Sequence, residues 1–125
     1  MAQTETGTDL GVRFLEALAR RDYGALAACF AADGALRAIV PPGAREDDGR
    51  AAIAARFRLW TEDCTDYEVV ETEATPFADL LRLRWVVRSI DPELGLCAYE
   101  QTAYAEVSDG RIARMRLACS GDRPL

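Results

Sequence analysis

Histidine and lysine are both absent from this 125-residue sequence, and their absence removes several kinds of functional site. A zinc site without histidine would need clustered cysteines, because thiolates and imidazoles are the ligands that zinc prefers. The cysteines are spaced about 22 to 35 residues apart, with no Cys-x-x-Cys pair. We therefore expect no metal site, and we interpret these residues as reduced and mostly buried: Cys29, Cys64, Cys97 and Cys119.

Positive charge is scarce as well. All 15 basic residues are arginines, 21 residues are acidic, and the formal net charge is −6. A phosphate backbone attracts a basic surface, and no stripe of basic and aromatic residues compensates locally. The charge balance therefore predicts a protein that binds no nucleic acid.

Long apolar runs and glycine-rich phosphate loops are also missing. No apolar run approaches the roughly 20 residues that a membrane-spanning helix needs. Residues 1–11 contain neither the basic region nor the apolar region of a secretory signal. We therefore expect a cytoplasmic protein with no membrane partner and no cofactor.

The residues that are present describe one globular domain. Half of them are hydrophobic and 29% are charged, unlike the composition of a disordered chain. A chain of this length buries roughly two-thirds of its unfolded surface in a single core. We assign residues 8–120 to this domain, residues 1–7 to a flexible N-terminus and residues 121–125 to a C-terminal tail.

Helices are predicted where apolar residues recur at intervals of three and four, in residues 10–20, 23–30 and 49–61. Asp22 is suited to cap the second helix, because its side chain can accept a hydrogen bond from a backbone N–H in the first turn. Residues 32–34 would end that helix in a turn.

Strands are predicted where large apolar or β-branched residues alternate with polar ones, in residues 35–40, 66–75, 79–90 and 96–119. The charged residues 44–48 are expected to form a loop. Asp109 and Gly110 are typical of a type I′ turn, which would divide the last segment into a hairpin. Helices followed by antiparallel strands indicate an α+β fold, with three N-terminal helices packed on a curved, mainly antiparallel sheet.

Side-chain alternation assigns the two faces of this sheet. Leu81, Leu83, Trp85 and Val87 would face inward, opposite Tyr99, Gln101 and Ala103, while the outward face would oppose arginines to glutamates. Such charge pairs stabilise an ordinary surface by about 0.2–1 kcal/mol each. They also suit a polar dimer face, and we predict a homodimer through this surface.

The last strand admits two arrangements. A regular hairpin would turn Arg114 and Arg116 toward the core, where an unpaired charge is costly. One β-bulge after Ile112 reverses the parity, so that Met115 and Leu117 enter the core instead. We favour the bulge.

Several segments together resemble the nuclear transport factor 2-like superfamily, in particular its SnoaL-like and ketosteroid-isomerase-like members. The resemblance spans residues 9–119 and rests on the order and spacing of Phe14 to Leu18, Asp22, Phe30-Ala31-Ala32-Asp33-Gly34, Gly49-Arg50-Ala51-Ala52-Ile53 and Asp109 to Met115. It implies a conical half-barrel around a blind pocket, in a group where homodimers are common. It implies no single function, because isomerases, polyketide cyclases, dehydratases, epoxide hydrolases and binding proteins share this fold.

The resemblance also identifies what this chain lacks. The ketosteroid isomerase base would fall at Ala38 and its oxyanion-hole acid near Ala103, while its pocket tyrosines would fall near Phe14, Phe30 and Phe57. Each of these positions is apolar here. Without histidine, the dehydratase and histidine-assisted cyclase mechanisms are also disfavoured.

The expected pocket is therefore apolar, with Tyr99 and Gln101 as its polar groups. Its predicted lining is Phe14, Phe30, Ala38, Phe57, Trp60, Leu83, Trp85, Tyr99, Gln101, Ala103 and Met115.

Three functions fit this pocket. The first is binding of an apolar small molecule, polycyclic compounds included. The second is a cyclase or isomerase that uses unrecognised groups, with Tyr99 as acid and Asp63 or Asp66 as base. The third is a dimerisation module whose pocket has collapsed beside a large apolar patch.

Overall fold

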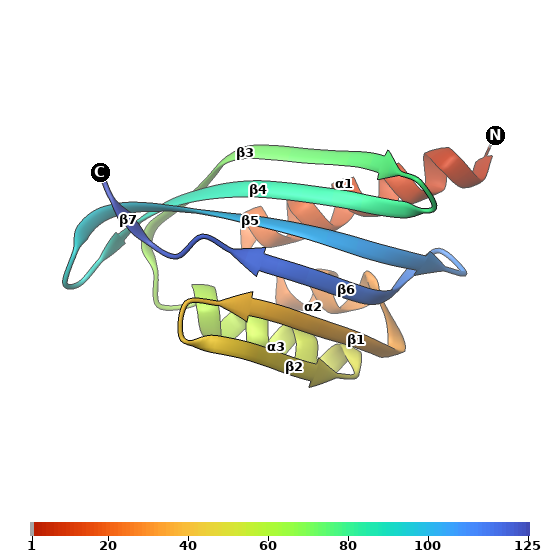
Figure 1. Cartoon of the computed structure of the whole chain (residues 1–125), viewed down its shortest axis with the longest axis horizontal. Helices are drawn as coiled ribbons and strands as arrows, with labels where there is room; N and C mark the ends of the chain where they lie inside the picture. Colours follow the sequence, from red (N-terminus) through yellow and green to blue (C-terminus); the bar gives the residue numbers. More distant parts are fainter. Residues whose placement is uncertain (1) are drawn as a thin grey trace.

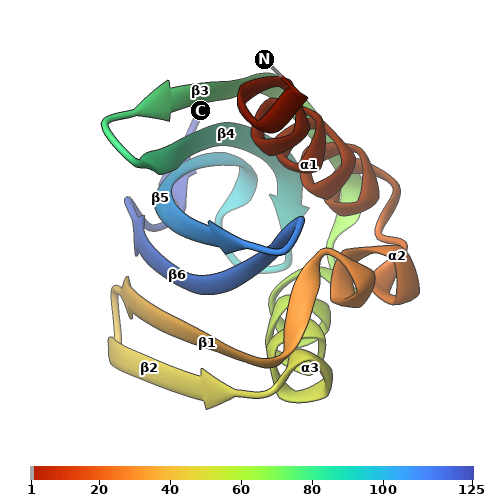
Figure 2. The ribbon, with the colours of Figure 1, turned by 90° about the vertical axis from the view of Figure 1, so that its right-hand side faces the viewer.

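Three helices cover one face of a curved, open seven-stranded sheet, as Figures 1 and 2 show. The structure is a computed structural model that describes residues 2–125, with side chains from Gly7 onward. It confirms the predicted α+β class and the curved half-barrel. The helices are α1 (Ala2–Arg20), α2 (Tyr23–Ala28) and α3 (Arg50–Thr61).

The sheet has the order β2-β1-β6-β5-β4-β3, and β7 pairs with β5. Neighbouring strands are antiparallel except for β1 and β6, which are parallel. The strands are β1 (Phe30–Val40), β2 (Gly43–Asp48), β3 (Thr65–Phe77), β4 (Leu80–Asp91), β5 (Gly95–Ser108), β6 (Arg111–Cys119) and β7 (Arg123–Pro124). No helix within residues 2–125 has the length and apolar character that crossing a membrane requires.

The first helix begins earlier than its apolar spacing indicates. Its backbone is helical from Ala2, so residues 2–7 of the expected flexible segment 1–7 belong to α1. Met1, at the start of that segment, lies outside the described residues, and the mobility of the first turn stays a prediction. The predicted cap of α2 is confirmed, since a carboxylate oxygen of Asp22 accepts a hydrogen bond of 3.1 Å from the Ala25 N–H.

Two local predictions are wrong. Phe30 begins β1 instead of ending α2, because α2 stops at Ala28 and Phe30 pairs with Ile112 of β6; the expected turn at 32–34 is an irregularity within β1. Residues 44–48 form β2 instead of a loop. Their charges suit an edge strand, where charged side chains discourage pairing with another molecule.

The hairpin of β5 and β6 contains the predicted bulge. Val107 pairs with Ile112 while Glu106 pairs with Arg114, which leaves Ala113 as the additional residue. Beyond the bulge Met115 and Leu117 are buried, whereas Arg114 and Arg116 are exposed. The turn itself has positive φ at both Asp109 and Gly110, as a type I′ turn requires.

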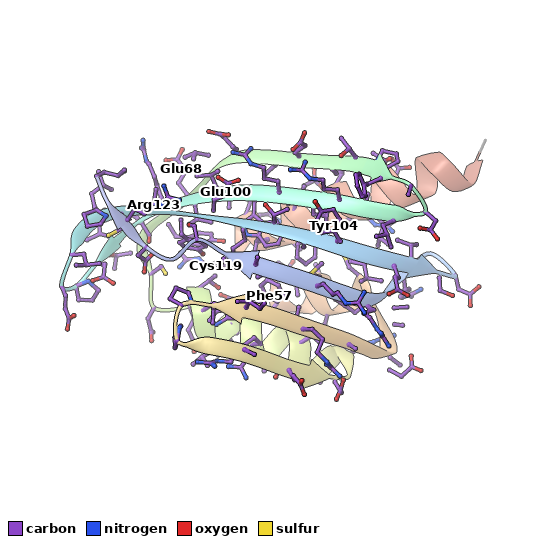
Figure 3. All side chains as sticks on the ribbon, viewed as in Figure 1. Phe57, Glu68, Glu100, Tyr104, Cys119 and Arg123 are labelled. Carbon is purple, nitrogen blue, oxygen red and sulfur yellow. The ribbon has the colours of Figure 1, made fainter. Side chains whose placement is uncertain are left out.

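The outer face of the sheet carries the predicted ladder of charges. Arg84 lies 2.6 Å from a carboxylate oxygen of Glu100 and 3.1 Å from one of Glu71. Tyr104 lies on the same face, with its ring 5.5 Å from that of Phe77. Figure 3 shows Glu100 and Tyr104 on β5, on the sheet face that points away from Phe57 and the helices.

A set of aromatic rings fills the space between the helices and the inner sheet face. Phe14 of α1 lies at its centre, with ring centroids 6.0 Å from Phe30, 5.7 Å from Phe57 and 5.5 Å from Trp85. All four side chains are fully buried. The interior of the half-barrel is therefore packed at the level of Phe14, and any open pocket must lie elsewhere.

Candidate functional site

An open pocket of about 520 Å³ lies between α3, the turn that joins β1 to β2, and the C-terminal residues 121–122. This volume is typical of small-molecule sites. We call it the Trp60 pocket; it is lined by Val40, Pro41, Pro42, Arg45, Arg56, Leu59, Trp60, Tyr99, Gln101, Cys119, Gly121 and Asp122.

Of the eleven residues predicted to line a pocket, three border this one: Trp60, Tyr99 and Gln101. The other eight lie in the packed core and are at most 2% exposed: Phe14, Phe30, Ala38, Phe57, Leu83, Trp85, Ala103 and Met115. The inward orientation of a side chain does not distinguish the three pocket residues from the eight core residues, because orientation does not determine how closely side chains pack. A role for the eight core residues in ligand binding stays a prediction.

Gln101 borders the pocket, and its side-chain oxygen is already engaged. The indole N–H of Trp85 donates a 2.8 Å hydrogen bond to the side-chain oxygen of Gln101, which fixes the orientation of the amide. The residues pair across β4 and β5, and both are buried. With the oxygen engaged by Trp85, the NH₂ group is the end of the side chain left to donate to a ligand.

Tyr99 lies two residues before Gln101 on the same face of β5, so the two side chains are about 7 Å apart along the strand. Burial raises the pKa of the Tyr99 hydroxyl well above its ordinary value. The hydroxyl therefore stays protonated at neutral pH and can donate a hydrogen bond. Tyr99 and Gln101 together supply two neighbouring donors on one wall.

Three charged side chains lie at the α3 side of the pocket. Two of them form an ion pair, and the third, an arginine, does not. Arg56 of α3 binds Asp47 through two contacts, of 2.8 and 3.4 Å. Arg45 of β2 donates to the carbonyl of the adjacent Ala44 and makes no ion pair within residues 7–125. The pocket thus has one uncompensated positive charge at this side.

Asp122 contributes a carboxylate from the C-terminal segment, which no sequence pattern places at a pocket. Backbone pairing of β7 with Cys97 and Ala98 brings this segment onto β5. Gly121 lies so close to Pro41 that an added Cβ would be 2.7 Å from the Pro41 ring, so only glycine fits there. Burial, and then the charge of Asp91, raise the pKa of Asp122.

The other candidate catalytic groups lie outside the Trp60 pocket or lack an activating partner. Asp63 follows α3, and Asp66 is at the start of β3; both are exposed and neither lines the pocket. All four cysteines are free thiols, and burial raises the pKa of Cys29 and Cys64, which keeps both protonated. Among the described side chains, no three His, Cys, Asp or Glu residues gather as metal ligands would.

The arrangement combines apolar walls with a few directed polar groups. Leu59 and Trp60 of α3 line the same pocket as the Tyr99 and Gln101 donors of β5. Such a site can hold a flat apolar body and offer hydrogen bonds to polar atoms at its edge.

Comparison with known proteins places this arrangement in a family. The SnoaL-like domain profile matches residues 12–115. No curated protein matches the sequence.

Three solved structures share the fold. A candidate polyketide cyclase from Xanthomonas campestris is 24% identical, with 92% of this chain and 90% of the other covered and a TM-score of 0.73. A candidate isomerase from Bacillus subtilis is 15% identical, with coverages of 96% and 90% and a TM-score of 0.78. An LEH-like epoxide hydrolase from M. tuberculosis is 19% identical, with coverages of 94% and 85% and a TM-score of 0.72. At these identities the likeness establishes the fold and leaves the reaction open.

Proposed function

Since this chain belongs to the SnoaL-like domain family, we propose that it binds a small molecule with an apolar, ring-shaped body in the Trp60 pocket. The orientation of Gln101, held by the Trp85 indole, is the observation that carries the proposal. A core glutamine could satisfy its whole amide internally, whereas no hydrogen bond with residues 7–125 engages the NH₂ group of this one, on the same strand face as Tyr99. An acceptor oxygen on the ligand, such as that of a ketone, would receive a hydrogen bond from the Tyr99 hydroxyl, and the Gln101 amide offers a second donor farther along the strand.

The names of the structural relatives are consistent with this chemistry. One of them is named as a candidate polyketide cyclase, and polyketides contain carbonyl groups. For this chain we propose binding and not a defined reaction, because Ala38 and Ala103 are buried methyl groups at the positions where the resemblance implies acids. Asp122 is the acid that borders the pocket, in place of Asp63 or Asp66.

Tyr99→Phe tests the donor pair. The hydroxyl makes no hydrogen bond with residues 7–125, so its loss should leave the unfolding temperature nearly unchanged. We expect the affinity for 2-acetonaphthone, measured by ligand-observed NMR titration, to fall about threefold to tenfold, the worth of one hydrogen bond. Affinity for naphthalene, which lacks an acceptor, should not change. Trp60→Ala should weaken binding of both probes, and failure of both probes to bind the unmodified protein would reject the proposal.

We further propose that the outer face of the sheet forms a homodimer. Ile39 on β1 is 68% exposed on this face, next to Tyr104 and the charge ladder. Apolar side chains bordered by paired charges are typical of the centre and rim of an interface. The self-complementary arrangement of arginine and glutamate fits a two-fold axis.

Ile39→Glu should therefore convert a dimer to a monomer. Multi-angle light scattering at micromolar concentration should give about twice the 13.7 kDa chain mass for the unmodified protein and the chain mass for the variant. The substitution removes an isoleucine that the dimer would bury and adds a charge there, which should weaken association at least about tenfold. Leu59→Glu is a matched control, because Leu59 is similarly exposed at 64% but lies on α3. A monomeric mass for the unmodified protein would contradict the proposal.

A further inference from the structure

Arg45 is a half-buried arginine at the edge of the Trp60 pocket, on β2, and it also borders the groove that contains Ile39 and Tyr104. Its described partner is the carbonyl oxygen of Ala44, at 3.0 Å. That single bond leaves most of its N–H groups without a partner, and it leaves the positive charge without a carboxylate. Partial burial of a charge is unfavourable unless the charge is paired, so this position favours an anionic ligand.

The neighbouring charges do not neutralise Arg45. Asp47, two residues along the same face of β2, is engaged by Arg56 at 2.8 Å, and both side chains of this pair are largely buried. Asp122 borders the same pocket but is not within ion-pair distance of either arginine. Besides burial, the negative charge of Asp91 raises the pKa of Asp122, and the charge of Asp122 contributes, after burial, to the raised pKa of Tyr99. The Asp122 carboxylate therefore lies at the β5 side of the pocket.

The surface beside Arg45 is apolar. Pro42 and Leu59 line the same pocket, and Leu59 is 64% exposed, which makes it a large apolar side chain with no cover. A ligand that reaches Arg45 from the pocket therefore passes over apolar groups with an aromatic ring, Trp60, next to them. An isolated anion such as phosphate would use the charge and leave these groups exposed.

We infer that the ligand of the Trp60 pocket is an amphipathic organic anion, whose carboxylate or similar group binds Arg45 while its ring system lies against Leu59 and Trp60. This inference rests on the proposed binding function and adds the charge of the ligand. It also accounts for an arginine without an ion pair at the pocket of an acidic protein, because a neutral ligand would gain less from this charge than an anion would.

Two probes of nearly the same shape test the inference, 2-naphthoate and the neutral 2-acetonaphthone. We expect the unmodified protein to bind 2-naphthoate more tightly, and Arg45→Gln to reduce that affinity by about tenfold or more while changing that of 2-acetonaphthone less than about twofold. Arg114→Gln is the matched control. It removes the same charge from an exposed arginine of β6 outside this pocket and should affect neither probe.

The outcomes separate this inference from the function on which it rests. If neither probe binds the unmodified protein, the proposed function fails and the anion inference fails with it. If 2-acetonaphthone binds at least as tightly as 2-naphthoate, or if Arg45→Gln weakens both equally, the anion inference is overturned and the binding function stands. Thermal unfolding of each variant should match that of the unmodified protein, since the side chain of Arg45 makes one bond to its own neighbour.

Discussion

Aspartate in place of Ala103 is expected to destabilise the protein strongly at neutral pH, although the family resemblance implies an acid near this position in ketosteroid isomerases. Ala103 is completely buried on β5 and pairs with Leu83 on one side and Leu117 on the other. A carboxylate there would have no partner and no water. We expect a loss of about 3–5 kcal/mol, the usual cost of an uncompensated buried charge, which is a large part of the stability of a small domain.

The pH dependence distinguishes charge from size. Burial raises the folded-state pKa of the introduced carboxyl. The loss of stability that comes from its charge is therefore absent below the unfolded-state pKa of about 4, and it grows as the pH rises above that value. Ala103→Asn adds a side chain of the same shape without a charge and should show no such trend. Urea unfolding of both variants between pH 4 and pH 8 is the measurement. A stable Ala103→Asp protein at pH 7 would mean that an open cavity reaches Ala103.

Polarity made the strand parity predictable from the sequence. In the last strand, a bulge at Ala113 is the arrangement that buries Met115 while leaving Arg114 in water, and the difference in burial cost is large enough to decide between the alternatives. The same reasoning placed Tyr99 and Gln101 inward. Every basic side chain of this sequence is an arginine, and the high cost of burying its charge made the alternation of inward and outward residues clear.

Pairing partners were less predictable than side-chain direction. Phe30 fits a helix face by its spacing from Tyr23, yet it joins β1, because a parallel partner on β6 is available to it. Residues 44–48 lack apolar character and still form β2, because an edge strand needs hydrogen bonds from one neighbour and no buried face. The partner of Phe30 lies far away in the sequence, and the pairing of residues 44–48 depends on their position at the sheet edge. Local sequence patterns contain no information about either.

The position of the pocket was the largest difference from expectation. The sequence indicates which side chains point inward but not whether they leave space between them, and the rings around Phe14 leave none. Asp122 was missed for a related reason. It follows the last predicted strand, and a two-residue pairing with β5 brings it to the Trp60 pocket. No periodicity can be detected in so short a segment.

Alanine in place of Phe14 is expected to destabilise the protein by about 3–5 kcal/mol, as removal of a buried phenylalanine does when its surroundings cannot collapse. Phe14 contacts three rings that come from β1, α3 and β4, so no single element can move to fill the space. Phe14→Leu retains much of the volume and should cost less. Thermal and urea unfolding of both variants measure the difference.

The same variant decides between the two pocket positions. If the interior is packed, Phe14→Ala creates a dry apolar cavity, and a small aromatic compound such as benzene should bind there and restore part of the lost stability. Benzene should not stabilise the unmodified protein at this level, because Phe14 already occupies the space. If Phe14→Ala costs little and 2-acetonaphthone binds it as it binds the unmodified protein, the aromatic residues line an existing cavity instead. The pocket predicted from the sequence would then be correct, and the ligand would extend past Gln101 and Trp85 into the half-barrel.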